Sequence, residues 1–205
     1  MRRLLYLSLI FCCLAEPARG QSKSSANVDI TLIQNTKAEQ QTRDQLQRLL
    51  REYDLTPFIF TRSIVIDETT IPHSHPVLTL HTRHLKDDEL LLSTFVHEQA
   101  HWWTTAQKNF TGMNSAVTEL RSMFPKVPVG APEGALNEDS NYLHLVVVYL
   151  EYRGVRELLG ELKARQVMEF WSTDHYTWIY KTVMERSRDI GNILAKYQLI
   201  PPRRP

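Results

Sequence analysis

Cysteine is almost absent from this chain. Its 205 residues contain two cysteines, Cys12 and Cys13, and both lie in an apolar segment at the N-terminus. A mature chain without that segment would contain no cysteine, so it would have no disulfide to stabilise its fold and no thiolate to bind a metal. Any metal site must therefore be built from histidines and carboxylates.

The chain also lacks an excess of charge and a second long apolar run. Its 24 Lys and Arg residues and 23 Asp and Glu residues give a formal net charge of +1, which offers no reason to expect nucleic acid or an acidic membrane surface as a partner. No segment after the N-terminal one is apolar and long enough to cross a bilayer, and no internal repeat is evident. The length suits one domain, so the function must come from a local site.

The N-terminus has the three parts of a secretory signal peptide. Residues 1–3 carry positive charge, residues 4–15 are apolar, and residues 18–20 form a small-x-small cleavage site before Gln21. The apolar run is too short for a comfortable membrane span, although retention as an uncleaved anchor stays open. We therefore expect a signal peptide over 1–20, a linker over 21–27, and one domain over 28–205 in the periplasm or outside the cell.

His97, Glu98 and His101 form a His-Glu-x-x-His motif inside residues 87–106, which read as a helix. Four residues make about one helical turn, so both imidazoles lie on one face and can bind a single zinc ion, with Glu98 beside the open coordination position. Ser and Thr residues share this face, while leucines and aromatic residues occupy the opposite side. The histidines are therefore expected to border a polar cavity.

A third metal ligand is expected from another element, because a catalytic zinc usually has three protein ligands and a water. In the apolar helical pattern around residues 141–150, Ser140, His144 and Glu151 fall on one narrow stripe. Burying His144 and Glu151 would be costly without a metal or a hydrogen-bond partner, so the stripe is expected to face the motif. Seven residues span about 10 Å of helix, so one of the two should bind the metal and the other should support it.

The residues themselves favour His144 as the third ligand, with Glu151 orienting a metal-bound imidazole through its second ring nitrogen. The reverse assignment stays open, and Glu138, near the start of the helix, is a weaker third choice. Zinc held by neutral imidazoles lowers the pKa of its bound water and polarises a carbonyl, so Glu98 can take a proton from the water and deliver it to the leaving amine. The predicted reaction is hydrolysis of a peptide bond in a peptide or protein substrate.

The rest of the chain mixes helical and β-like patterns. Thr36 and Glu39 make a capping box that opens an amphipathic helix, and residues 58–67 and 77–83 are β-like runs separated by prolines. The motif helix comes next, and the remainder reads as helical, with the proline-rich residues 125–132 as a connection. We predict an α+β fold with a short N-terminal sheet and a mostly helical C-terminal half.

Two β runs followed by a His-Glu-x-x-His helix and by ligand candidates on a later helix resemble the zincin metallopeptidases, in particular small gluzincin-like proteins of bacteria. The segments PHSHPVLTLHTRHL, TFVHEQAHWW and NYLHLVVVYLEY also resemble a family of exported bacterial proteins classed as candidate metallopeptidases, whose substrate is not established. The chain departs from the metzincin pattern, which would have Gly and His in place of Thr104 and Gln107.

The gluzincin resemblance implies a small zincin-like domain that binds Zn²⁺. It also implies Glu151 as the third ligand, which would leave His144 to contact the substrate. In that class a Tyr or His from a later helix donates to the oxyanion of the tetrahedral intermediate. The candidates here are His175, Tyr176 and Tyr180, for which packing in an aromatic core is the alternative explanation.

Residues 74–84 are expected beside the cleft, because in zincins the strand before the motif helix pairs with extended substrate. Several histidines lie in or near this run, and they are irregularly spaced and interrupted by prolines. They are His73, His75, His81 and His84. This spacing favours solvated or hydrogen-bonded side chains over a second metal site.

Two other classes of protein stay open. One is a zincin-like binding module that has lost catalysis, and the intact Glu98 argues against it. The other is an iron oxygenase with two histidines and a carboxylate as ligands, which would use Glu151 and would not need Glu98.

Overall fold

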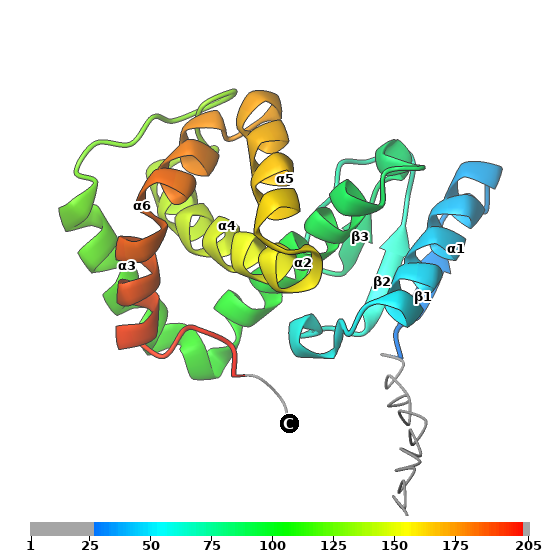
Figure 1. Cartoon of the computed structure of the whole chain (residues 1–205), viewed down its shortest axis with the longest axis horizontal. Coiled ribbons are helices and arrows are strands. Elements are labelled where there is room, and N and C mark those ends of the chain that lie inside the picture. The colour runs from blue at the N-terminus through cyan, green and yellow to red at the C-terminus, as the bar shows by residue number, and fades with distance from the viewer. Residues whose placement is uncertain (1–26, 203–205) are drawn as a thin grey trace, which may run out of the picture.

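Helices and a small sheet make up residues 27–202, the part of the chain that the computed structural model describes (Figure 1). The strands are β1 (Asp29–Leu32), β2 (Ser63–Ile66) and β3 (Leu78–Leu80). The α-helices are α1 (Lys37–Glu52), α2 (Asp88–Thr105), α3 (Phe110–Met123), α4 (Glu138–Leu159), α5 (Glu161–Asp174) and α6 (Thr177–Lys196). Short 3-10 helices occur at η1 (Thr56–Phe58), η2 (Thr82–His84) and η3 (Gln107–Asn109). The predicted mixture of a short N-terminal sheet with a mostly helical C-terminal half is confirmed.

The signal peptide predicted over 1–20 lies outside the described residues, as do both cysteines and all but the last residue of the predicted linker. Among the helices of residues 27–202, none combines the length and the apolar character that a membrane span needs.

The sheet is parallel, in the order β1-β2-β3, with Asp29 opposite Ser63 and Ile64 opposite Leu78. Its strands are shorter than the sequence predicted. The run over 58–67 becomes a strand only at Ser63, because a 3-10 turn containing Pro57 comes first and the following backbone bonds to a side chain of α2. β1 was not predicted, since its alternation of polar and apolar residues covers only four positions beside a polar linker.

At the start of α1, one of the two hydrogen bonds of the predicted capping box is present and the other is replaced. The backbone N–H of Glu39 donates to the Thr36 hydroxyl at 3.2 Å. The buried Glu39 carboxylate does not reach back to Thr36; instead it accepts from the backbone N–H groups of Gln34 and Glu68, at 2.9 and 3.3 Å. The carboxylate therefore ties the start of α1 to the end of β2.

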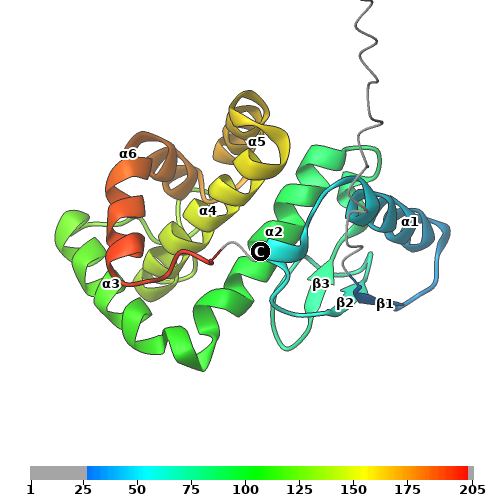
Figure 2. The same ribbon diagram turned by 60° about the horizontal axis from the view of Figure 1, so that its bottom comes forward.

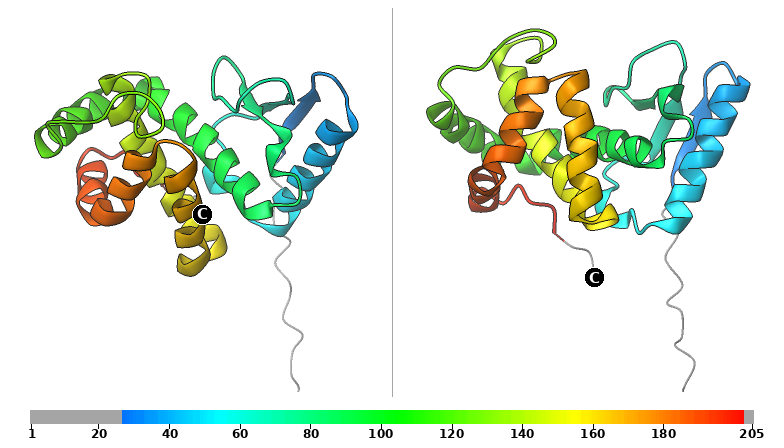
Figure 3. Two further views of the ribbon diagram at one scale, coloured as in Figure 1. Left: turned by 90° about the horizontal axis from the view of Figure 1, so that it is seen from above. Right: turned by 45° about the horizontal axis from the view of Figure 1, so that its top comes forward.

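Helix α2 lies between α1 with the sheet on one side and α4, α5 and α6 on the other (Figures 2 and 3). It separates two hydrophobic cores. Leu91, Leu92 and Phe95 pack with α1 and the sheet on one side, and Ala100 and Trp103 pack with α4, α5 and α6 on the other. Such a helix is buried almost all round, so the few polar groups it carries need partners inside the protein. The His-Glu-x-x-His motif lies in this helix.

A glycine allows α4 to approach α2 closely. A Cβ atom on Gly154 would lie 2.8 Å from Cγ1 of Val96 and 3.1 Å from Cε1 of Phe58, which is too close for a side chain. Glu151 stands one turn earlier on α4, so this approach brings its carboxylate against the polar side of α2.

Candidate metal centre

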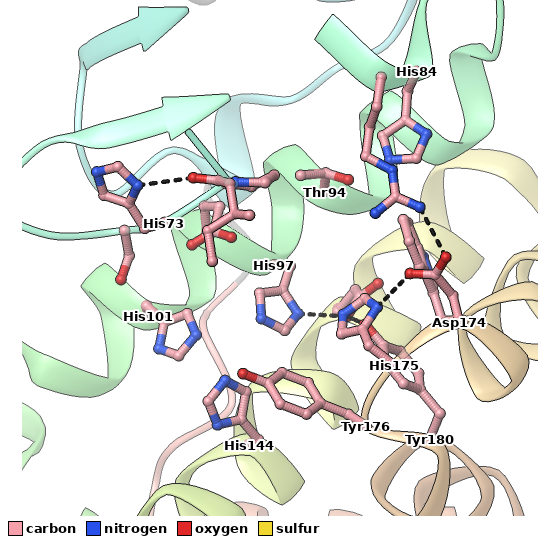
Figure 4. Close-up of a pocket in the computed structure, with 17 residues that line it drawn as sticks. His73, His84, Thr94, His97, His101, His144, Asp174, His175, Tyr176 and Tyr180 are labelled. Atoms are coloured by element: carbon pink, nitrogen blue, oxygen red, sulfur yellow. Dashed lines mark hydrogen bonds and ion pairs between the residues drawn. The ribbon is translucent and has the colours of Figure 1, made fainter. Parts of the chain in front are cut away.

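Three imidazoles meet where α2 and α4 pack together. One ring nitrogen from each of His97, His101 and His144 can be chosen so that all three atoms lie within 4.8 Å of one another. Figure 4 shows these rings beside one another, and their centroids are 5.0 to 5.7 Å apart. In residues 27–202 no other group of His, Cys, Asp and Glu side chains converges in this way. We call these residues the three-histidine group.

Hydrogen bonds fix two of the three rings. His97 Nδ1 donates to Glu151 Oε2 at 2.8 Å, and His144 Nδ1 donates to the Ser140 carbonyl oxygen at 2.7 Å. A ring that donates through Nδ1 keeps its lone pair on Nε2, which is the form a metal-binding imidazole needs. Three neutral nitrogen donors with a fourth position left to solvent suit a catalytic zinc.

Glu151 lies behind His97 and outside the three-histidine group. Its carboxylate is 1% exposed and accepts three hydrogen bonds. The donors are the Ser93 hydroxyl at 2.5 Å, His97 Nδ1 at 2.8 Å and the Tyr180 hydroxyl at 3.0 Å. Both carboxylate oxygens are therefore engaged with protein groups.

The geometry thus resembles the first of the two arrangements that the sequence left open, with His144 beside the motif histidines. Glu138, the weaker choice, lies on the surface next to Arg121, at 3.5 Å.

Burial keeps two of the imidazoles neutral. It lowers the pKa of His101 to about 2 and that of His144 to about 4, and the nearby His97 adds to both shifts. Burial also opposes charge on His97, but the hydrogen bond and negative charge of Glu151 outweigh it, so the pKa of His97 is raised. A neutral imidazole is the state that binds a metal, and a metal on Nε2 of His97 would take the place of the proton that Glu151 favours.

Glu98 is buried and has no hydrogen-bond partner in residues 27–202. The residue is 6% exposed and its side chain lines the cavity. Burial raises the pKa of Glu98 to about 7, against the opposing charge of His97. A bound divalent cation would lower this pKa again. A carboxyl group with these properties can exchange a proton near neutral pH.

The three-histidine group and Glu98 line a cavity of about 540 Å³. The expectation that residues 74–84 border it holds for the ends of the run and not for its middle. Ser74, Arg83 and His84 line the cavity, whereas β3 is buried between β2 and the backbone of His73, which pairs with Thr79. The segment that runs along the cavity is therefore 71–74, whose His73 pairs with β3 on the cavity side.

Of the three candidate oxyanion donors, Tyr176 lies nearest the three-histidine group. Its ring centroid is 4.5 Å from that of His144, and Figure 4 shows its hydroxyl directed toward the imidazoles. The residue has a left-handed backbone, with φ of 48°, just before α6. The loop before α4 braces this turn, because Thr177 N–H donates to the Pro132 carbonyl at 3.0 Å. The sequence around Tyr176 reads as helical, and in the structure this residue lies just before the first turn of α6.

The other two candidates differ in what they can donate. His175 lines the cavity, and its Nδ1 donates to Asp174 Oδ2 at 2.8 Å. Tyr180 also lines it, but its hydroxyl proton is committed to Glu151. Tyr180 therefore supports Glu151 from the core. A neutral His175 carries its one N–H on Nδ1, so Tyr176 is the candidate that keeps a proton to donate to a ligand.

The other histidines near residues 73–81 form no second group of possible metal ligands in the described chain. His73 Nδ1 bonds to the Ile71 carbonyl oxygen, and the ring of His75 stacks on Trp102 at 4.4 Å. His81 bonds through both of its ring nitrogens to backbone groups.

Sequence reasoning missed two charged residues of the cavity, Arg83 and Asp174, which form an ion pair of 2.8 Å. They are 91 positions apart and belong to no motif, so no pattern in the sequence joins them.

His84 is expected to make the fold sensitive to acid. It is 5% exposed and packs edge-on to Trp171, and its buried Nε2 has no partner among the described residues. Burial, with the charge of Arg83, lowers its pKa from 6.5 to about 4. Between pH 4 and 6.5 the unfolded chain binds more protons at this histidine than the folded chain does. The contribution of neutral His84 to the free energy of unfolding is therefore fully present above pH 6.5, and it falls by about 2 to 3 kcal/mol as the pH drops to 4.

The measurement is the free energy of unfolding of the wild type and of His84→Phe between pH 4 and 8, since phenylalanine keeps the ring and cannot titrate. The difference between the two proteins should change between pH 6.5 and 4 and stay constant above that range. A constant difference throughout would show that His84 does not cause the sensitivity.

No protein-family model, no curated protein and no solved structure matches this chain. A function for it therefore has to be argued from its own residues.

Proposed function

We propose that this protein is an exported, zinc-dependent peptide hydrolase with a small zincin-like domain. One observation carries the proposal: three buried imidazoles converge beside Glu98, a buried glutamate with no hydrogen-bond partner among the described residues, on the wall of one cavity. Supporting features are the sheet before the motif helix, the later helix that supplies the third imidazole, and the signal-like N-terminal sequence.

Each group has a role in this proposal. Zinc, when bound by His97, His101 and His144, lowers the pKa of a water molecule and polarises the scissile carbonyl. Glu98 accepts the proton of the attacking water and delivers it to the leaving amine. The Tyr176 hydroxyl donates a hydrogen bond to the developing oxyanion.

The three histidines as possible metal ligands favour this proposal over an iron oxygenase with a carboxylate ligand. That arrangement would need an oxygen of Glu151, and both of its oxygens already accept hydrogen bonds from buried donors. Breaking them would leave buried polar groups unpaired at a cost of about 1 to 3 kcal/mol each.

The test is a metal analysis of the mature protein together with digestion of a peptide library. We expect one equivalent of zinc, cleavage that stops after chelation, and cleavage that returns when zinc is added back. Protein that holds a full equivalent of zinc and cleaves no peptide would instead indicate a binding module. An equivalent of iron would favour a redox enzyme.

A further inference from the structure

A single guanidinium reaches the cavity that the three-histidine group lines. Arg83 is the one Lys or Arg residue among the lining residues of the described chain. It belongs to η2, where its backbone N–H donates to His81 Nδ1 at 2.8 Å, so its position is fixed by a tight turn. Its side chain is 43% exposed, and the guanidinium lies 5.9 Å from the centre of the Trp171 ring.

Most of the hydrogen-bonding capacity of Arg83 is unused. A guanidinium has five N–H groups, and in residues 27–202 only Nη2 has a partner, Asp174 Oδ1 at 2.8 Å. The other oxygen of Asp174 accepts from His175, as Figure 4 shows. The planar fork of these free N–H groups matches the geometry of a carboxylate.

Protein donors already occupy two of the three carboxylates that line the cavity. Both oxygens of Asp174 and both oxygens of Glu151 already accept hydrogen bonds from protein donors. Among the carboxylates that line the cavity, this leaves Glu98, which the proposed reaction uses for the attacking water. Asp174 and Glu151 therefore have less hydrogen-bonding capacity left for a substrate amine than Arg83 has for a substrate anion.

We propose that Arg83 binds a carboxylate of the substrate, so that the enzyme prefers peptides with a negative charge close to the scissile bond. This inference rests on the proposed peptidase function. The carboxylate has two possible sources, the C-terminus of a peptide or the side chain of an acidic residue. Recognition of the first would make the enzyme a carboxypeptidase, and recognition of the second would make it an endopeptidase for acidic sites.

The kinetic test uses zinc-loaded protein and matched peptides. One pair differs in a free or amidated C-terminus, and a second pair differs in Glu or Gln beside the cleaved bond. We expect the wild type to prefer the carboxylate member of one pair, and Arg83→Gln to reduce this preference in kcat/KM about ten- to a hundredfold, mainly through KM. Arg153→Gln, which replaces an arginine on α4 outside this cavity, is the matched control and should keep the preference.

A merely structural role for Arg83 predicts a different pattern. If Arg83 acted only by holding Asp174, and through it His175, the variant would slow both members of each pair equally and leave the preference unchanged. That result would overturn the proposal. So would a wild type that cleaves both members of both pairs equally well.

A binding measurement separates this inference from the proposed function. Metal-free protein is titrated with an N-acetyl amino acid and with its amide, and binding is followed by NMR. We expect the acid to bind more tightly than the amide and Arg83→Gln to remove the difference. Carboxylate binding at Arg83 without any peptide cleavage would contradict the peptidase alone, and cleavage without carboxylate binding would contradict the inference alone.

Discussion

Replacing Glu98 by Gln is expected to reduce kcat/KM for peptide hydrolysis by about a hundred- to ten-thousandfold, the usual contribution of a general base. Glutamine has the same shape and cannot accept the proton of the attacking water. Zinc should stay bound at full stoichiometry, because the three-histidine group does not include Glu98. The measurement is steady-state kinetics on a cleaved library peptide, with metal analysis of the same protein sample.

Glu89→Gln is the matched control for this change. Glu89 lies on the same helix, in its first turn, where it pairs with Lys163 at the surface. Losing an exposed ion pair costs about 1 kcal/mol at most, so this variant should keep its turnover and its zinc. Unchanged turnover in Glu98→Gln would rule out the hydrolytic mechanism, and loss of zinc from it would show that Glu98 acts on the metal site itself.

The parts of the site that the sequence could predict are those defined by spacing along one helix. His97 and His101 are one turn apart on α2, and His144 and Glu151 are two turns apart on α4, so helical geometry alone places each pair on one face. The capping residue Thr36 was equally local, and its hydrogen bond is present.

The parts that could not be predicted depend on contacts between distant elements. The ion pair of Arg83 and Asp174 joins η2 to the end of α5, and the direction of the Tyr176 side chain depends on a left-handed residue braced by a loop some 40 positions earlier in the chain. Gly154 matters because Val96 and Phe58 lie against it. None of these neighbours can be inferred from the local sequence around each residue.

The same limit explains why the sequence left the third ligand open. Spacing predicts that only one of His144 and Glu151 binds the ion, and it does not show which of them lies nearer the motif. The answer depends on where α4 crosses α2. In the structure the crossing places Glu151 against Ser93 and His97, and it places the ring centroid of His144 5.0 Å from that of His101.

Substitutions at His144 and Glu151 are therefore expected to affect zinc affinity unequally. Total zinc binding energies of about 10 to 16 kcal/mol over four protein ligands make each ligand worth about 2.5 to 4 kcal/mol, so His144→Ala should weaken zinc binding by about sixty- to seven-hundredfold. Glu151→Gln removes a carboxylate that orients His97, and the loss should be about ten- to a hundredfold. The measurement is competition for zinc against a chelator of known affinity.

The order of the two losses decides between the arrangements, because Glu151 as the direct ligand would make its substitution the more severe. His81→Ala, which changes a histidine outside the three-histidine group, should keep the affinity of the wild type. Unfolding of the metal-free variants must be followed as well, since Glu151 accepts from three buried donors and its loss also destabilises the fold. A Glu151→Gln protein that unfolds more easily without zinc and still binds zinc more tightly than His144→Ala would place Glu151 behind the metal site and His144 in it.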